Sequence, residues 1–226
     1  MKHKIGSAAH LAHRFLDRGD AVLDIGAADG AYTRVYADRV GRTGSVLAVE
    51  PNVRHLGQLL DACEPMPWVS IWYGAVGRDR LGLGWLHEDA DDPKRSSLWA
   101  SNVSRPGHGY HVAVTTVDAL IETMPQQPKL IQVDAQGAEA DIVAGAGKAL
   151  TAPIVWVLEI WREGLANAGA TVDDVLLPFE VHGYTARSIA GARIEWDDLR
   201  EQVRPHLGVT HADVVLVPDA LKGADW

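Results

Sequence analysis

The fold of this 226-residue chain is decided by one stretch, Val22-Leu23-Asp24-Ile25-Gly26-Ala27-Ala28-Asp29-Gly30. An apolar run contains Asp24, turns through Gly26 and Gly30, and leads into a helical pattern that starts at Ala31. Glycine lets the backbone approach a ligand closely, and the free amides at the start of a helix face that ligand. The stretch predicts a strand, a glycine-rich turn and a helix that hold a ligand. The alternative is a turn that only closes a strand–helix unit.

A second acidic residue, Glu50, ends the next apolar run, twenty residues after Gly30. An acid at this place can accept both hydroxyls of a ribose, as in nucleoside sites at the carboxyl edge of a parallel sheet. The turn lacks the middle glycine of the dinucleotide fingerprint, and Asp24 and Asp29 put negative charge where phosphates would sit. The pattern favours a cationic ligand, such as an ammonium or a sulfonium. A nicotinamide-dependent oxidoreductase is one alternative function, which the missing glycine disfavours.

Apolar runs and helical patterns alternate along the rest of the chain. Runs that are apolar on both faces are typical of parallel strands covered by helices. The alternation predicts an α/β fold: a doubly wound, mostly parallel sheet with helices on both faces and an antiparallel edge formed by the tail from Tyr184 to Trp226. The expected strands are Ala21–Ile25, Val46–Val49, Val69–Tyr73, Leu130–Val133, Ile154–Ile160 and Val214–Val217. The expected helices are Ala31–Arg39, Val53–Ala62, Val117–Met124, Ala138–Leu150 and Val172–His182.

We expect one domain over residues 1–226, with two additions to the alternating pattern. Residues 1–20 predict a short amphipathic helix with Ser7 as its N-cap. Residues 77–111 are too long for a bare connection and predict an irregular insertion that serves as a substrate lid. Within it we expect a small β excursion around Leu83–His87 and a mobile segment around Ser96–Tyr110, with Trp85 and Trp99 lining the lid.

The composition narrows the class of protein. The chain has 30 acidic and 21 basic residues, a formal net charge of −9 and 47% hydrophobic residues, which is typical of a globular protein. The acidic balance repels a phosphate backbone, so we expect no nucleic-acid partner. Cys63 is the single cysteine, which excludes an internal disulfide. No run approaches the about 18 apolar residues of a membrane span, and no secretory signal is present, so we expect a cytoplasmic protein without membrane contact.

The motifs resemble those of a known family. The turn resembles motif I of the class I S-adenosylmethionine-dependent methyltransferases, with Glu50 as the ribose-binding acid. The stretch from Ala21 to Trp161 is similar to the FkbM family, whose motifs resemble Asp24–Thr33, Val49–Asn52, Ser96–Leu98, Thr116–Leu120 and, most selectively, Leu130–Glu139.

The resemblance implies a class I methyltransferase that uses S-adenosylmethionine to methylate a hydroxyl of a small molecule or glycan. It also implies that Ala75 and Val76, after the third strand, lie where related folds hold the adenine ring. The cofactor-binding residues that we expect are Asp24, Gly26, Ala27, Asp29, Gly30, Tyr32, Thr33, Glu50, Pro51, Asn52, Ala75, Val76 and Asp134.

Two residues depart from the family pattern. Gln132 stands where lysine is usual, and Gln136 stands where glutamate is usual. Glutamine keeps the hydrogen-bonding capacity of glutamate but cannot accept a proton as a base or bind a metal as an anion. The alternative function is therefore a degenerate family member that binds the cofactor without catalysis.

Four residues are candidates for catalysis. Asp134 and Glu159 end two strands that this fold places side by side, where their carboxylates can hold an acceptor hydroxyl, share a proton or bind Mg²⁺. Asp134 can equally cap the following helix, and Glu159 needs a partner if it is buried. Glu139 lies in the first turn of a helix, where the dipole favours acids regardless of function. His108, in the insertion, can be a base or simply a solvated side chain.

Overall fold

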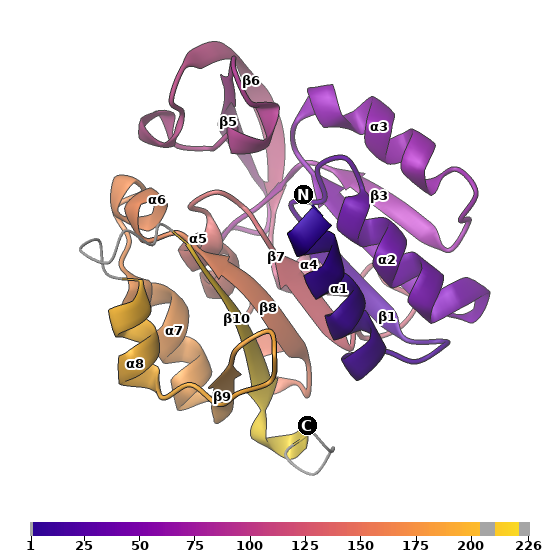
Figure 1. The fold of residues 1–226 in the computed structure, drawn as a ribbon. Coiled ribbons are helices and arrows are strands. Elements are labelled where there is room, and N and C mark those ends of the chain that lie inside the picture. The colour runs from indigo at the N-terminus through magenta and orange to yellow at the C-terminus, as the bar shows by residue number, and fades with distance from the viewer. Residues whose placement is uncertain (1, 204–210, 222–226) are drawn as a thin grey trace.

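The computed structural model describes residues 2–203 and 211–221. Its large sheet has the strand order β3-β2-β1-β7-β8-β10-β9 (Figure 1). The first five of these strands are parallel, and β10 runs antiparallel to both of its neighbours. The strands are β1 (Ala21–Ile25), β2 (Ser45–Glu50), β3 (Val69–Tyr73), β7 (Leu130–Val133), β8 (Val155–Ile160), β9 (Tyr184–Arg187) and β10 (Ala212–Pro218).

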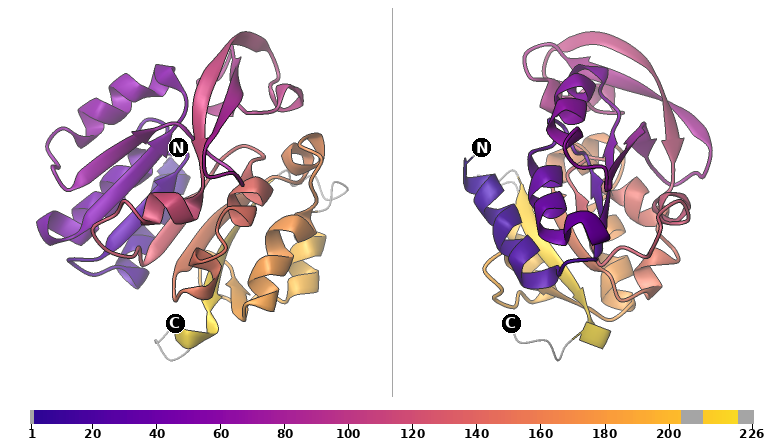
Figure 2. Two further views of the ribbon diagram at one scale, coloured as in Figure 1. Left: turned by 180° about the vertical axis from the view of Figure 1, so that it is seen from behind. Right: turned by 90° about the vertical axis from the view of Figure 1, so that its right-hand side faces the viewer.

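Helices cover both faces of this sheet (Figure 2). One face packs against α1 (Lys2–Phe15), α2 (Ala31–Val40) and α3 (Val53–Cys63). The other face packs against α4 (Val117–Ile121), α5 (Glu139–Ala144), α6 (Arg162–Asn167), α7 (Val172–Val181) and α8 (Trp196–Gln202). None of the helices in the described ranges has the length and apolar character that a membrane span requires.

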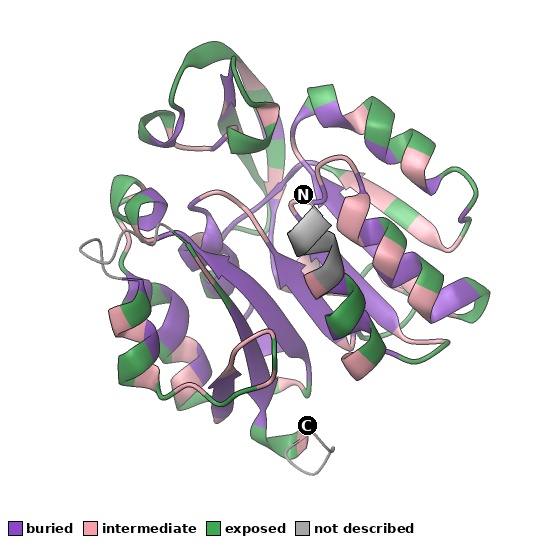
Figure 3. Ribbon diagram, viewed as in Figure 1, coloured by how far each residue is buried: buried purple, intermediate pink, exposed green. Residues whose placement is uncertain are grey.

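The central strands are buried on both sides (Figure 3). In β1, Val22 belongs to the core on the α1–α2 side, whereas Leu23 and Ile25 belong to the core on the opposite side. Burying a large aliphatic side chain completely contributes about 1.5–3 kcal/mol relative to leaving it exposed. The mostly apolar runs of the sequence therefore become the middle layer of a three-layer fold.

The insertion and the residues that flank it form a second, three-stranded sheet in the order β4-β6-β5. Its strands are β4 (Ala75–Val76), β5 (Gly82–Asp89) and β6 (Pro106–Thr115), and β5 runs antiparallel to β6. Figure 1 shows this pair projecting away from the large sheet. The connection between β5 and β6, residues 90–105, holds the short 3₁₀ turns Pro93–Arg95 and Ala100–Asn102.

The predicted doubly wound sheet with an antiparallel pair at one end is confirmed. β1, β3 and β7 have the predicted bounds, and the other predicted strands differ at their ends by one or two residues. Residues 204–210 and 222–226 of the predicted tail, including Trp226, lie outside the described residues.

Several boundaries were wrong. The helix expected over Ala138–Leu150 is shorter, because α5 already ends at Ala144. The next residue, Gly145, packs so closely against the backbone of Gly77 that a Cβ would lie 2.2 Å from the Gly77 carbonyl oxygen. The helix expected over Val117–Met124 ends at Ile121. Ser7 lies inside α1 rather than at its N-cap.

The insertion is also more regular than expected. Residues 106–110, which we placed in a mobile segment, pair with β5 as the first half of β6. The predicted β excursion is confirmed as β5.

Candidate active site

A cleft of about 650 Å³ lies beyond the carboxyl ends of β1, β2, β7 and β8. The strand order reverses between β1 and β7, which is where ligands bind in open α/β sheets. A cavity of this volume is in the range that holds one cofactor-sized molecule. The residues that line it include those at these strand ends and a segment of the insertion, residues 92–98, which we call the strap.

The glycine-rich turn forms the floor of the cleft. Gly26 has a φ of +86°, and a Cβ there would lie 2.0 Å from the carbonyl oxygen of Asp134. Glycine is therefore required where β1 passes the end of β7. The amides of Gly26 and Ala27 donate to the carbonyl of Val49 at 2.9 and 3.0 Å, which ties the turn to β2. Ala28 follows with a φ of +47°, in the left-handed region that non-glycine residues seldom adopt.

Glu50 is held at the end of β2 by two backbone amides. Its Oε2 accepts from Ala28 N at 2.8 Å and its Oε1 from Asn52 N at 2.7 Å. Burial raises the pKa of Glu50 to about 7, the two N–H donors oppose this, and the like charges of Asp24 and Asp134 add to it. A carboxylate offers about four lone pairs, so two remain for hydroxyl donors in the cleft.

Three residues of the first motif lie behind the wall of the cleft instead of lining it. Asp24 is buried and accepts the hydroxyl hydrogen bond of Thr33 at 2.6 Å. Burial raises the pKa of Asp24 to about 6, the Thr33 bond lowers it, and Asp134 raises it further. Gly30, with a φ of +79°, packs against Leu59 of α3. Asp24, Gly30 and Thr33 therefore do not line the cleft, and in this structure they support the turn from beneath; the cofactor contacts that we expected from them stay predictions.

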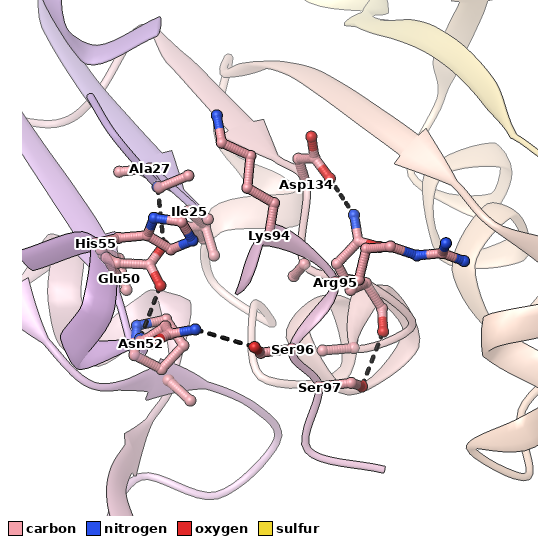
Figure 4. A pocket seen from close by; sticks show the side chains of 18 of the residues that line it. Ile25, Ala27, Glu50, Asn52, His55, Lys94, Arg95, Ser96, Ser97 and Asp134 are labelled. Carbon is pink, nitrogen blue, oxygen red and sulfur yellow. Dashed lines mark hydrogen bonds between the residues drawn. The ribbon is translucent and has the colours of Figure 1, made fainter. Parts of the chain in front are cut away.

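The other expected cofactor residues do line the cleft. They are Gly26, Ala27, Asp29, Tyr32, Glu50, Pro51, Asn52, Ala75, Val76 and Asp134. Ala75 and Val76 are buried in β4 and give the β2 side of the cleft an apolar wall. Figure 4 shows Glu50 and Asn52 at this end and Asp134 on the other side of the strap.

The strap spans the cleft and is tied at both sides. Asn52 donates from Nδ2 to the carbonyl of Pro93 at 3.0 Å and to Ser96 Oγ at 2.9 Å. Ser97 donates from Oγ to the carbonyl of Gln136 at 3.0 Å. Lys94 forms an ion pair with Asp29 at 2.7 Å. The strap therefore connects the ends of β2 and β7 over the cleft.

A buried carboxylate, Asp89, fixes the loop that carries the strap. It accepts backbone N–H bonds from Asp91, Asp92, Ser104 and Arg105 at 2.8–3.3 Å. Burial would raise the pKa of Asp89, but these four donors outweigh it and the pKa is lowered. The two ends of the loop are thus joined by hydrogen bonds to a residue that the sequence did not single out.

The far end of the cleft holds the expected pair of carboxylates. Asp134 and Glu159 both line it. Gln136 donates from Nε2 to Asp134 Oδ1 at 2.9 Å, and its own φ is +52°. The ring of Trp161 stacks on that of His211, with 5.9 Å between centroids, and both residues line the same end.

Glu139 and His108, the other two catalytic candidates, do not line the cleft. Glu139 is buried beneath the cleft, where its Oε1 accepts from Ala135 N at 3.3 Å and Gly137 N at 3.2 Å. Burial raises the pKa of Glu139 to about 7 against these donors. It positions the loop after β7 and does not line the cleft. His108 is exposed on β6, also outside the cleft.

The two tryptophans expected in the lid do not line the cleft either. Trp85 lies 44% exposed on β5, with its ring 4.9 Å from that of His111. Trp99 packs partly buried against the main core. The strap, rather than an aromatic lid, covers the cleft. Among the described residues, no group of three or more His, Cys, Asp or Glu side chains is placed to hold a metal, so the Mg²⁺ expectation at Asp134 and Glu159 gains no support.

Sequence reasoning missed several residues that line the cleft. Lys94 and Arg95 lie on the strap, His55 lies on α3, and Trp161 and His211 lie at the far end. The Asp92-Pro93 pair is a turn signal that marks the start of the strap. Nothing local in the sequence indicated that this turn would fold back over the first strand.

Comparisons with known proteins agree with this geometry. The profile of the Methyltransferase FkbM domain family matches residues 24–185. A putative rRNA methylase of Clostridium thermocellum has a similar fold, with a TM-score of 0.56, 11% identity and 94% of each chain covered. An rRNA methylase of Streptococcus thermophilus gives a TM-score of 0.52, with 12% identity and the same coverage. At these identities the similarity shows the fold alone.

Two curated relatives share a short stretch with this chain. The ribosomal RNA large subunit methyltransferase E of Anaeromyxobacter sp. (strain Fw109-5) is 48% identical over 58 residues, which is 25% of this chain and 18% of that protein. The protein of the same name from Anaeromyxobacter dehalogenans (strain 2CP-C) is 50% identical over 47 residues, 20% of this chain and 18% of that protein. The chain thus matches less than a fifth of the length of these relatives.

Proposed function

The chain belongs to the FkbM methyltransferase domain family, whose cofactor is S-adenosylmethionine, and we propose that it methylates a hydroxyl group of a small molecule or glycan. The observation that carries this proposal is one continuous cleft with a doubly held carboxylate, Glu50, at one end and two carboxylates, Asp134 and Glu159, at the other. The first end suits a nucleoside and the second suits the acceptor.

The residues at the first end fit the cofactor. Glu50 is fixed by Ala28 N and Asn52 N, so its remaining lone pairs are preorganised for the two ribose hydroxyls. Ala75 and Val76 offer the apolar surface that an adenine ring requires. Asp29 supplies negative charge near the turn, which suits a cationic amino-acid end and repels a pyrophosphate. When bound, the cofactor supplies a methyl group on a positively charged sulfur.

The residues at the second end would orient the acceptor and take its proton. We assign Asp134 as the base that accepts the hydroxyl proton while the oxygen forms its bond to the methyl carbon, whose bond to sulfur breaks and leaves its electron pair on the sulfur. The Gln136 amide holds one oxygen of Asp134 in place, and Glu159 on the neighbouring strand accepts a second hydroxyl of the acceptor. Positioning of this kind supplies much of the rate for an already activated donor.

Charge supports a small acceptor. Asp134, Glu159 and Glu163 all line the acceptor end, and the whole chain carries a net charge of −9. A phosphate backbone would be repelled there. An RNA acceptor is nevertheless a second candidate, because the two curated relatives act on ribosomal RNA by name and the strap carries Lys94 and Arg95.

The test has two steps. Calorimetry with S-adenosylhomocysteine measures binding, and mass spectrometry then follows its formation from S-adenosylmethionine with a panel of sugars, other alcohols and ribosomal RNA. Binding and turnover with an alcohol or sugar support the proposal. Turnover with RNA alone favours the second candidate. Binding without turnover on any acceptor favours the degenerate alternative, and the absence of binding overturns the assignment of the cleft.

A further inference from the structure

An ion pair between Asp29 and Lys94 lies in the wall of the cleft, with 2.7 Å between Oδ2 and Nζ. We propose that these two side chains form a clamp for the α-amino-acid end of the cofactor, in which Lys94 binds the carboxylate and Asp29 binds the ammonium. The inference rests on the proposed function, because it concerns the same site. It assigns to Lys94, a residue of the insertion, the recognition of the carboxylate in the amino-acid end of the ligand.

Asp29 is placed by the glycine-rich turn. It directly precedes Gly30, at the start of α2, and its carboxylate accepts a hydrogen bond from the amide of Ala31. Its side chain lines the cleft and is 25% exposed, so water reaches it only in part. The carboxylate is therefore fixed by local geometry before any ligand binds.

Lys94 is placed by contacts of its backbone and of its neighbours. Its amide donates to Asp92 Oδ1 at 3.1 Å, and Asn52 holds both Pro93 and Ser96 on either side of it. Asn52 in turn donates its amide to Glu50. The strap that carries the ammonium of Lys94 is thus connected by two hydrogen-bonded steps to the acid assigned to the ribose.

The two strap cations point in different directions. In Figure 4 the side chain of Lys94 extends toward the side of Ala27, and that of Arg95 extends away from it, beyond Asp134. Lys94 therefore belongs with the turn and Arg95 with the acceptor end. Of these two cations, only Lys94 is paired with a carboxylate of the turn.

An α-amino acid matches this pair in charge and in spacing. Its ammonium and carboxylate are attached to one carbon, so both can enter an existing ion pair at once. The ligand ammonium takes the place of the Lys94 ammonium beside Asp29, and the ligand carboxylate takes the place of the Asp29 carboxylate beside Lys94. A partly exposed ion pair contributes little to stability, so opening it costs little. The charge-assisted hydrogen bonds that replace it, inside a cleft, are stronger than those to water.

Three ligands test the clamp by calorimetry: S-adenosylmethionine, its decarboxylated form and 5′-methylthioadenosine. The decarboxylated form keeps the ammonium but lacks the carboxylate, and methylthioadenosine lacks both groups. We expect the unaltered protein to prefer S-adenosylmethionine over the decarboxylated form by about tenfold. Lys94→Gln should remove this preference and leave the affinity for methylthioadenosine unchanged. Asp29→Asn should weaken both ligands that carry the ammonium, again without an effect on methylthioadenosine.

Arg105→Gln is the matched control, because Arg105 is an exposed cation of the same insertion that pairs with Asp91 and does not line the cleft. It should bind all three ligands like the unaltered protein. If Lys94→Gln weakens all three ligands equally, Lys94 only holds the strap and the clamp is overturned. Equal affinity of the unaltered protein for S-adenosylmethionine and its decarboxylated form also overturns the clamp but leaves the proposed function standing. Failure of the unaltered protein to bind any of the three overturns the proposed function itself.

Discussion

Gln136 donates a hydrogen bond from its Nε2 to Oδ1 of Asp134 at 2.9 Å, and it does so from a backbone in the left-handed region, with φ at +52°. Such a conformation in a residue with a Cβ costs about 1 kcal/mol and persists only where the surroundings impose it. Here the carbonyl of Gln136 accepts from Ser97 and Asn102, which fixes the backbone. Gln136, one of the two residues that depart from the expected family pattern, is therefore the one that holds the proposed base.

Gln136→Glu tests this contact through stability. The new carboxylate would lie beside Asp134, so at pH 8 we expect the free energy of unfolding to fall by about 1–3 kcal/mol. At pH 5 repulsion should be weaker, because the introduced carboxyl can take a proton and then donate to Asp134, so most of the loss should disappear. Urea unfolding at both pH values measures the effect, with Gln58→Glu on the exposed side of α3 as a control. A loss that is the same at both pH values would contradict the contact.

Glu50 predicts a pH dependence of cofactor binding. Burial raises its pKa to about 7, and hydroxyl donors bind the ionised form better. The affinity for S-adenosylhomocysteine should therefore rise from pH 6 to pH 8, by up to about tenfold. Glu50→Gln should bind more weakly at pH 8 and lose this dependence, because an amide does not titrate. Calorimetry at the two pH values decides, and a flat profile in the unaltered protein would count against the ribose assignment.

Asp134→Asn should separate binding from catalysis. The like charge of Asp134 raises the pKa of both Glu50 and Asp24. Removing it lowers the pKa of Glu50, so the midpoint of the binding profile in the previous experiment should move to lower pH while the affinity at pH 8 stays unchanged. With an acceptor identified, turnover should fall by about 10²–10⁴-fold. An unshifted midpoint would show that the two carboxylates do not interact.

Glu139→Gln should reduce the loss of stability at high pH. In the folded protein Glu139 keeps its proton up to a pKa of about 7, whereas in the unfolded chain it loses it near 4.5. The folded state therefore binds more protons between these values, and stability falls as pH rises through the interval, by about 3 kcal/mol for this residue. Urea unfolding at pH 5 and pH 8 should show a smaller fall in Glu139→Gln. Glu64→Gln, at the exposed end of α3, should keep the original fall, and a variant at 139 that also keeps it would refute the assignment.

Tyr36→Phe tests whether Gln132 is structural. Tyr36 is buried, and its hydroxyl donates to Gln132 Oε1 at 2.9 Å, away from the cleft. Without this donor the buried amide oxygen is unpaired, so the free energy of unfolding should fall by about 1–3 kcal/mol. The affinity for S-adenosylhomocysteine should stay within about twofold of the original, because neither residue of the pair lines the cleft. A twofold change corresponds to less than 1 kcal/mol. A loss of affinity as large as that of Glu50→Gln would place this pair in the binding site.

The amino-acid sequence by itself determined the parallel sheet and indicated the edge of the sheet at which the cleft lies. Runs such as Val46–Val49 are apolar without alternation, which is typical of a strand covered on both faces, and Gly26 and Glu50 mark the ends of β1 and β2. These signals are local, because the burial of a strand and the need for glycine at a tight turn can both be inferred from consecutive residues in the sequence.

Only the tertiary structure decided which acids line the cleft and what covers it. Asp24 and Glu139 turned out to be buried behind it, whereas Lys94 was brought to Asp29 from 65 residues away and Ser96 to Asn52 from 44 residues away. The strap owes its conformation to such distant partners and to the four amides that Asp89 collects from both ends of its loop. Contacts between residues this far apart depend on how the whole chain closes, and no pattern in neighbouring residues encodes them.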